Sequence, residues 1–166
     1  MAGLDPSPAR KRLRLSERLV AGSVLVHPCA HTRAELFPVL VDALCAARGL
    51  GDRDQILSNL EERERRMSTA VGMGLAIPHA RVESIPDLFA AAATCPDGLD
   101  FPVPDGLPVR LVVLLVSPPS AAGLHVQALA AVGRLSGELI ADLLAAPDAE
   151  RFLARLAFEE SLEPLR

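Results

Sequence analysis

The sequence has neither tryptophan nor tyrosine, and five phenylalanines are the only aromatic residues among its 166 residues. Nucleic-acid bases stack on aromatic side chains, so this scarcity argues against a protein that binds single strands. The charge gives the same indication, because a net charge of −4 and a pI near 5.6 leave no excess of basic residues to contact phosphates. We therefore expect a protein that does not bind nucleic acid.

Cysteine is also scarce. The three cysteines, Cys29, Cys45 and Cys95, are widely spaced and form no Cys-x-x-Cys pair. Such a pair would indicate zinc or redox chemistry, and without one we expect buried free thiols in a reducing cytoplasm. His27 and His31 flank Cys29, but no second local cluster supplies the ligands that a metal would still need. The sequence thus predicts no metal site.

Long apolar runs are missing as well. The longest stretch, Leu111 to Val116, is far too short to span a bilayer, which takes about 20 residues. The basic cluster at residues 10–14 is not followed by the apolar core of a signal peptide. These absences predict a soluble, cytoplasmic protein that is not embedded in a membrane.

Half of the residues are hydrophobic, which is enough to build one domain with its own core. Residues 1–14 combine small residues, prolines and a basic cluster, and they predict a flexible N-terminal tail. The folded domain should then extend over residues 15–166. The basic cluster could instead contact a membrane surface or a nucleic acid, but a solvated terminus is the simpler expectation.

The first helical segments are indicated by caps and apolar stripes. Two capping boxes are expected, one formed by Thr32 with Glu35 and the other by Asp52 with Gln55. The first helix should bury a stripe from Leu36 to Cys45 and end at Gly49. The second ends in the charged run 61–66, which is typical of a solvated helix face with pairs such as Glu61–Arg65.

The clearest strand is Val109 to Val116, whose apolar run indicates burial on both faces. Helices should therefore cover both sides of a sheet, which predicts an α/β fold. Residues 23–26 and 89–94 predict further strands, the second of them followed by a turn at 96–98. One long helix should run from about Gly123 through Ile140, and Asp148 should cap a final helix.

The most distinctive stretch is residues 68–81, where two glycines, a short apolar run and a proline precede a histidine. The glycines allow backbone conformations closed to other residues, and Pro78 holds Ile77 extended. His79 should then stand at the end of a short buried strand, with its base buried and its tip open.

Two further residues are candidates for a site with His79. His125 lies in the first turn of its helix, where the positive helix end favours a neutral ring. Arg63 precedes His79 in the sequence, at the end of the second helix. Two neutral imidazoles and an arginine suit phosphoryl transfer, in which one ring attacks while the other groups hold the phosphoryl oxygens. A satisfied structural histidine is the plainer alternative for each ring.

The residues then show a resemblance to a known family. Arg63-Glu64, Ser68-Thr69 and Gly72-x-Gly74-Leu75-Ala76-Ile77-Pro78-His79 resemble the signature of the enzyme IIA domain of the fructose/mannitol type. These domains belong to the bacterial phosphoenolpyruvate-dependent phosphotransferase system, in a branch that includes the nitrogen-regulatory IIA proteins. The resemblance covers nearly the whole chain, from the strand at Ser23 to the helix of His125.

The resemblance implies a single-domain three-layer α/β/α sandwich with a mixed β-sheet. It implies that His79 is phosphorylated, that Arg63 lies beside it and that His125 is the second active-site histidine, with no metal or other cofactor. Three positions depart from the family pattern: Ala70 replaces a frequent glycine, Met73 a frequent asparagine and Arg110 a frequent acidic residue. We expect Met73 to affect partner docking more than chemistry.

The implied phosphate donor is an HPr-type phosphocarrier protein or its nitrogen-branch counterpart. We favour a regulatory role, in which phosphorylation controls binding to a target protein, because the 166 residues include no fused enzyme IIB, membrane IIC or carrier domain. The alternative is a sugar-transport enzyme IIA that passes phosphate to an enzyme IIB. A family member that kept only the fold would take up no phosphate at all.

Overall fold

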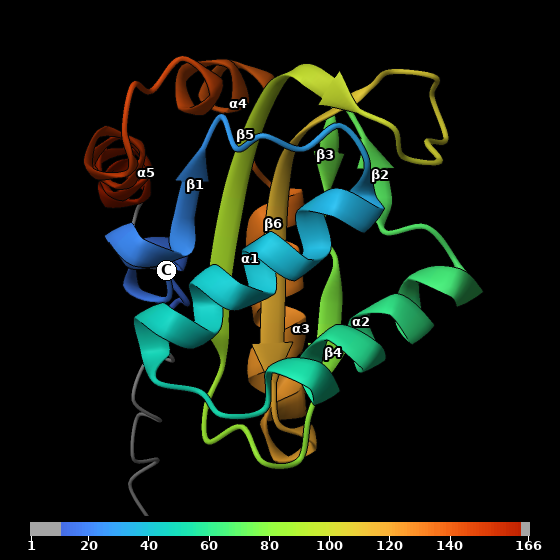
Figure 1. Cartoon of the computed structure of the whole chain (residues 1–166). Helices are drawn as coiled ribbons and strands as arrows, with labels where there is room; N and C mark the ends of the chain where they lie inside the picture. The colour runs from blue at the N-terminus through green and yellow to red at the C-terminus, as the bar shows by residue number, and fades with distance from the viewer. Residues whose placement is uncertain (1–10, 164–166) are drawn as a thin grey trace, which may run out of the picture.

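The computed structural model describes residues 11–163, in which a mixed six-stranded sheet lies between two layers of helices (Figure 1). The strands are β1 (Val24–Val26), β2 (Ala70–Gly72), β3 (Leu75–Ala76), β4 (His79–Arg81), β5 (Phe89–Leu99) and β6 (Val109–Ser117). The helices are α1 (Arg33–Arg48), α2 (Arg53–Arg66), α3 (Ala122–Gly133), α4 (Gly137–Leu144) and α5 (Ala149–Leu162). Three short 3₁₀ turns are η1 (Leu15–Glu17), η2 (Ala21–Ser23) and η3 (Pro119–Ala121). Residues 1–10 of the expected tail lie outside the described residues.

The sheet is organised around β6, in the order β1-β5-β6-β3-β2, with β4 also paired to β6. The β5–β6 and β2–β3 pairs are antiparallel, and the β1–β5, β3–β6 and β4–β6 pairs are parallel. In the register along β6, Leu75 lies opposite Leu111 and His79 lies opposite Leu115, so β3 and β4 keep the same offset. β3 and β4 therefore lie along the same edge of β6 as two segments of one interrupted strand, with no shift in register between them.

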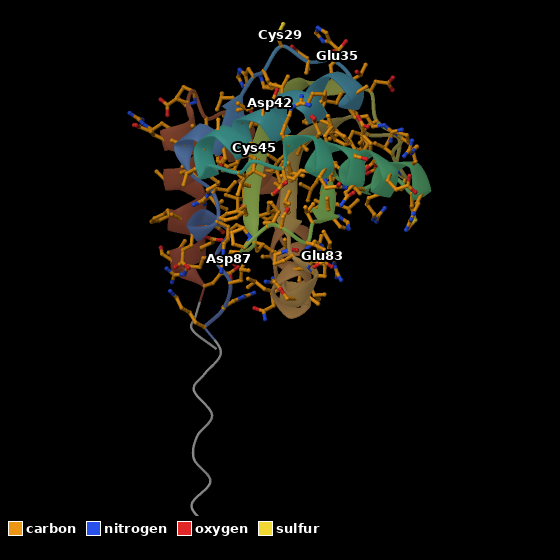
Figure 2. All side chains as sticks on the ribbon, turned by 60° about the horizontal axis from the view of Figure 1, so that its bottom comes forward. Cys29, Glu35, Asp42, Cys45, Glu83 and Asp87 are labelled. Atoms are coloured by element: carbon orange, nitrogen blue, oxygen red, sulfur yellow. The ribbon has the colours of Figure 1, made fainter. Side chains whose placement is uncertain are left out.

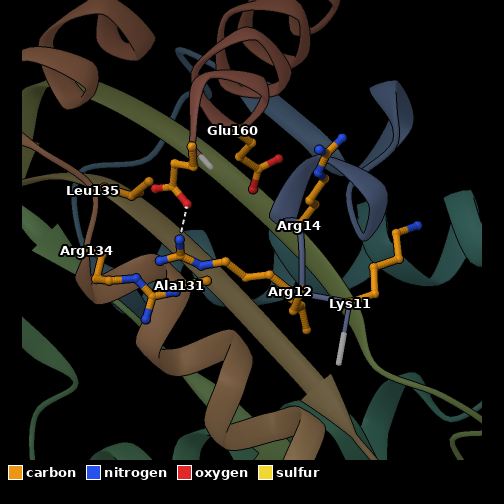
Figure 3. A pocket seen from close by; sticks show the side chains of 9 residues that line it. Lys11, Arg12, Arg14, Ala131, Arg134, Leu135 and Glu160 are labelled. Carbon is orange, nitrogen blue, oxygen red and sulfur yellow. Dashed lines mark ion pairs between the residues drawn. The ribbon is translucent and has the colours of Figure 1, made fainter. Parts of the chain in front are cut away.

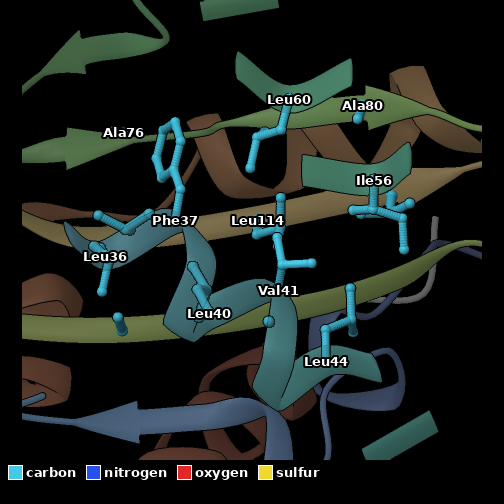
Figure 4. Close-up of a cluster of buried hydrophobic side chains, with 14 of the residues drawn as sticks. Leu36, Phe37, Leu40, Val41, Leu44, Ile56, Leu60, Ala76, Ala80 and Leu114 are labelled. Carbon is cyan, nitrogen blue, oxygen red and sulfur yellow. The ribbon is translucent and has the colours of Figure 1, made fainter. Parts of the chain in front are cut away.

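The predicted three layers are confirmed, because the side chains of β6 alternate between two cores. Val112, Leu114 and Val116 pack in the core beneath α1 and α2, part of which Figure 4 shows. The intervening residues Leu111, Val113 and Leu115 pack in the core under α3, α4 and α5. Burial of this one strand on both faces, as the apolar run indicates, therefore joins the two helical layers.

The first capping box forms with one change. Thr32 Oγ1 accepts from the N–H of Glu35 at 3.2 Å, while the Glu35 carboxylate accepts from the N–H of His31 at 2.8 Å instead of from Thr32. The second prediction is wrong, since Asp52 makes no side-chain cap and accepts a hydrogen bond from the Ser84 hydroxyl at 2.6 Å. Its carboxylate thus ties the start of α2 to the segment after β4.

Two other expectations are wrong. The single long helix is divided into α3 and α4, because Ser136 starts a new helix by accepting from the N–H of Leu139 at 3.1 Å. The expected turn at 96–98 belongs to β5, whose register against β6 shifts between Thr94 and Leu99. Gly98, at φ 87°, provides the irregular backbone of that shift. The cap at Asp148 is confirmed by its 2.8 Å bond from the N–H of Arg151.

All three cysteines are free, and only two are buried. Burial raises the pKa of Cys45 and raises that of Cys95 to about 11, so both are inert thiols. Cys29 is exposed in the loop between β1 and α1, which corrects the expectation of three buried thiols (Figure 2). None of the described helices has both the length and the apolar character needed to cross a membrane.

Candidate functional site

His79 is the first residue of β4, which differs from the expected place at the end of a strand. Pro78 has no N–H to donate, but its carbonyl accepts from the N–H of Leu115 at 3.0 Å, and pairing with β6 resumes at once. Nδ1 of His79 lies 2.8 Å from the carbonyl oxygen of Ile77. A carbonyl can only accept, so Nδ1 carries the hydrogen and, in the neutral ring, Nε2 holds the lone pair.

His125 lies against His79, as the sequence analysis expected. The ring centroids are 5.3 Å apart and the planes meet at 63°. His125 comes from the first turn of α3, and its side chain is buried. Its Nδ1 is 2.6 Å from the hydroxyl of Ser117, the last residue of β6. The end of β6 and the start of α3 therefore hold this ring between them.

Arg63 lines the same hollow, which has a volume of about 500 Å³. Arg63 Nη1 donates to the carbonyl of Met67 at 2.8 Å, across the end of α2. The structure thus brings all three predicted residues to one place. Besides these three residues, the hollow is bordered by Asn59, Glu62, Arg66, Ala80, Arg81 and Leu129.

The site favours neutral imidazoles. Burial is the main cause that lowers the pKa of His79, assisted by the charges of Arg63 and Arg81 and opposed by the Ile77 carbonyl and by Glu64. Burial, the neighbouring ring of His79 and the charge of Arg81 lower the pKa of His125 to about 4. Near neutral pH the lone pair on Nε2 of His79 is therefore available for attack.

Glu64 was not among the residues predicted for the site. The charged run 61–66 was expected to be solvated, but Glu64 is buried beneath the loop that leads to His79. Its carboxylate accepts from the N–H and hydroxyl of Thr69, at 3.0 and 2.6 Å, and from Arg33 at 3.1 Å. The expected Glu61–Arg65 pair is not the observed one, since Arg65 pairs with Glu62 at 2.6 Å. A signal was available, because Glu64 follows Leu60 by one helical turn on the buried side of α2.

Arg81 and Ser117 were missed as well. Arg81 follows His79 by two residues on β4, and its charge acts on both rings. Two residues along a strand return to the same face, which is the signal that could have identified Arg81. Ser117 belongs to a Ser-Pro-Pro-Ser segment that is typical of a turn, and no pattern in the sequence indicates its contact with His125.

A second hollow, of about 70 Å³, lies at the other end of α3 (Figure 3). It is bordered by the basic residues Lys11, Arg12, Arg14 and Arg134. Arg12 pairs with Glu163 at 2.7 Å, and Lys11 pairs with Glu17 at 3.3 Å, so these two cations are held against the domain. No histidine lines this hollow, whereas His79 and His125 line the first.

Within residues 11–163, no group of three or more His, Cys, Asp or Glu side chains is arranged to hold a metal ion. The segment with His27, Cys29 and His31 therefore lacks a geometry for metal binding. The hollow of His79 is lined by a second imidazole, His125, and by the guanidinium groups of Arg63, Arg66 and Arg81.

Residues 19–158 match the model of a family described as the phosphoenolpyruvate-dependent sugar phosphotransferase system, EIIA 2. A Haloferax volcanii protein described as the PTS system fructose-specific EIIA component is 33% identical over 103 residues, which are 62% of this chain and 67% of that protein. A Bradyrhizobium diazoefficiens nitrogen regulatory protein is 38% identical over 100 residues, which are 59% of this chain and 65% of that protein. These alignments span about two thirds of each relative.

Among solved structures, the nitrogen regulatory protein IIA-Ntr from Neisseria meningitidis superposes with a TM-score of 0.77 at 26% identity. The superposition covers 85% of this chain and 97% of that one. The family match over residues 19–158 includes Arg63, His79 and His125.

Proposed function

The chain belongs to the EIIA 2 family of the phosphoenolpyruvate-dependent sugar phosphotransferase system, and we propose that His79 is the residue on which it carries phosphate. The observation that carries this proposal is the hydrogen bond from Nδ1 of His79 to the Ile77 carbonyl at 2.8 Å. This bond fixes the ring so that the lone pair of Nε2 is the nucleophile. The hollow supplies Arg63 and Arg81 beside it.

In the proposed step, Nε2 of His79 attacks the phosphorus of a phosphohistidine on an HPr-type carrier. A P–N bond to His79 forms as the P–N bond of the donor breaks, and the donor imidazole keeps the electron pair. The hydrogen on Nδ1 stays with the Ile77 carbonyl, which stabilises the positive charge that develops on the attacked ring. No co-reactant is required, because one P–N bond replaces another.

Arg63 and His125 would hold the phosphoryl group during transfer. A guanidinium binds phosphoryl oxygens through two N–H groups, and the charge that it meets is largest in the transition state. Arg63 is tied to Met67 by one of its nitrogens, which leaves further N–H groups for the phosphoryl oxygens. His125 is held at its Nδ1 and can turn only its other nitrogen toward the phosphate.

A regulatory role of the nitrogen type is the main function that we propose. It is supported by the similarity to the nitrogen regulatory proteins of Bradyrhizobium diazoefficiens and Neisseria meningitidis. In this role the phosphorylation state of His79 would decide which target protein is bound. A sugar-transport role is the second candidate, supported by the similarity to the fructose-specific component of Haloferax volcanii, and it would require an enzyme IIB as acceptor.

The test is incubation of the purified protein with phosphoenolpyruvate, enzyme I and HPr, followed by intact mass. We expect one acid-labile phosphate on the parent protein and none on His79→Ala. His31→Ala is the matched control, because His31 is an exposed histidine outside the hollow, and it should be labelled like the parent. An unlabelled parent, or equal label on His79→Ala, would refute the proposal.

A second stage separates the two roles. The phosphorylated protein is mixed with a membrane fraction that contains enzymes IIB and IIC, and phosphorylation of added fructose or mannitol is measured. A transport protein should drive sugar phosphorylation in proportion to its own concentration. No sugar phosphate above the level found with His79→Ala is the result expected of the regulatory role.

A further inference from the structure

The hydrogen bond between Ser117 and His125 determines more than the position of the ring. Ser117 is 0% exposed and His125 is 2% exposed, and the hydroxyl lies 2.6 Å from Nδ1. The distance alone does not say which group donates. Either the hydroxyl donates to a bare Nδ1, or a protonated Nδ1 donates to the hydroxyl oxygen, and the two arrangements place the ring hydrogen on opposite nitrogens.

The direction follows from the hydrogen of the Ser117 hydroxyl. Among residues 11–163, Nδ1 of His125 is the only group with which this hydroxyl forms a hydrogen bond. If the ring donated, the hydroxyl hydrogen would be buried with no acceptor, which is the costly arrangement for a polar group out of contact with water. If the hydroxyl donates, both atoms are satisfied. Ser117 is therefore the donor and Nδ1 the acceptor.

The hydrogen of the neutral ring of His125 must then lie on Nε2. Nδ1 and Nε2 are on different edges of the ring, and Nδ1 is occupied by Ser117. The ring borders the hollow that also contains His79. Nε2–H is accordingly the group that His125 can present to an oxygen bound at His79. The opposite tautomer would present a lone pair there, and a lone pair repels phosphoryl oxygens.

We propose that Ser117 is a positioning residue for phosphoryl transfer, which sets the tautomer of His125 so that its Nε2–H donates to a phosphoryl oxygen on His79. This inference rests on the proposed function and goes beyond it. Ser117 touches neither the phosphorus nor the attacking nitrogen and acts entirely through His125. The serine thus converts the imidazole into a hydrogen-bond donor of fixed direction without giving it a charge.

The first test requires no substitution at Ser117. The full chain is labelled with ¹⁵N, and the imidazole nitrogens are recorded at neutral pH through their long-range couplings to ring protons. His125→Ala and His79→Ala spectra assign the signals. We expect a protonated, pyrrole-type Nε2 and a bare, pyridine-type Nδ1 in His125, and the reverse in His79. A His125 ring protonated on Nδ1 overturns the proposal.

The second test is a cycle of substitutions read out by the rate of phosphorylation. Ser117→Ala should lower the rate about ten-fold, the loss expected for one hydrogen bond to the transition state. In the His125→Ala background the same substitution should change the rate less than two-fold, because Ser117 then has no ring to orient. An additive ten-fold loss in that background would show that Ser117 acts by another route and would overturn the proposal.

Ser117→Thr is the matched rescue variant. It keeps the hydroxyl at a β-strand position where a β-branched residue is favourable, so the His125 tautomer should be that of the parent. Its rate should lie closer to that of the parent than to that of Ser117→Ala. A Ser117→Ala protein that keeps both the parent tautomer and the parent rate contradicts the inference. Thermal unfolding of each variant shows whether the fold is retained.

The two proposals fail in different ways. If the parent protein takes up no phosphate from HPr, the proposed function is refuted. The tautomer of His125 is tested separately, because it is measured on the unphosphorylated chain. If the parent is phosphorylated on His79 but the rate of phosphorylation does not depend on Ser117, the proposed function stands and only the role of Ser117 is refuted.

Discussion

The buried carboxylate of Glu64 accepts two hydrogen bonds from Thr69, one from its N–H and one from its hydroxyl. The carbonyl of Thr69 in turn accepts from the N–H of Ile77 at 2.9 Å, and the carbonyl of Ile77 accepts from Nδ1 of His79 at 2.8 Å. A continuous set of hydrogen bonds therefore links α2 to the proposed nucleophile. Glu64 is also the neighbour of Arg63 in the sequence, so the end of α2 positions both the arginine and the His79 loop.

We expect Glu64→Ala to lower the free energy of unfolding by about 3 kcal/mol, because it leaves Arg33 and the N–H of Thr69 without their partner. The rate of phosphorylation should fall as well, since the loop that orients His79 loses its anchor. Urea unfolding and the HPr-dependent rate are the measurements. Glu61→Ala removes an exposed carboxylate from the same helix and serves as the control. Equal stability of the two variants would contradict this account.

Part of this structure could be predicted from the sequence because its signals are local. The apolar run from Leu111 to Val116 predicts burial on both faces of the strand, and the spacing of Thr32 and Glu35 predicts the helix cap. The candidates Arg63, His79 and His125 depended on a motif, and the structure brings them together.

The wrong predictions concern residues whose role is decided by a contact with another part of the folded chain. Asp52 has the spacing of a cap, but Ser84 from a distant segment binds its carboxylate. Glu64 lies among five other charged residues, so the polarity of the run concealed its place on the buried side of α2. Ser117 follows a strand and precedes two prolines, which indicates a turn, and only the folded chain places it against His125.

The arginines of the hollow should differ in importance according to their partners. Arg66 pairs with Glu62 at 3.4 Å, whereas no carboxylate within residues 11–163 lies at ion-pair distance from Arg63 or Arg81. An arginine without a carboxylate partner has its charge available for a phosphoryl group.

We expect Arg63→Ala to lower the phosphorylation rate about 100-fold and Arg81→Ala about ten-fold, as for the loss of groups that stabilise transition-state charge. Arg66→Ala, the matched control in the same hollow, should change the rate less than about two-fold, because the Arg66 side chain is mostly exposed and its Nε lies 3.4 Å from the Glu62 carboxylate. Single-turnover transfer from phosphorylated HPr measures all three. A rate for Arg66→Ala as low as that for Arg63→Ala would contradict the ranking.

Met73 has an unfavourable backbone conformation. Its φ is 56°, and the only other non-glycine residue with positive φ in the described chain is His27, so Ala70 adopts an ordinary conformation and does not require glycine. Met73 borders a separate hollow with Arg110 and Leu107, and the hollow around His79 does not include it. The departures from the family pattern at Met73 and Arg110 are therefore outside the hollow in which we propose that phosphate is transferred.

Met73→Asn should raise the free energy of unfolding by about 0.5 kcal/mol, because asparagine tolerates the left-handed conformation better than methionine. The rate of phosphorylation of His79 should not change. The effect of Met73 on the choice of partner stays a prediction, and it is tested by comparing the affinity of the parent and Met73→Asn for a IIB domain or a regulated target. A change in the phosphorylation rate itself would contradict the separation of the two hollows.

The lowered pKa values of the two histidines predict how stability depends on pH. Burial lowers the pKa of His79 and lowers that of His125 to about 4, below the ordinary value of 6.5. Between these values the unfolded chain binds more protons than the folded chain. The contribution of these histidines to the free energy of unfolding is therefore greatest above about pH 6.5 and decreases as the pH falls toward 4. For His125 alone the decrease is about 3 kcal/mol.

Urea unfolding at intervals between pH 7.5 and 5 measures this effect in a range where ordinary carboxylates stay ionised. His125→Asn should flatten the dependence, because asparagine has no proton to gain. His31→Ala, which removes an exposed histidine, should leave the slope as in the parent. A parent protein whose stability is constant from pH 7.5 to 5 would mean that His125 can be protonated in place. The lowered pKa of His125 would then be contradicted, because the ring would titrate near its ordinary value of 6.5 in the folded protein.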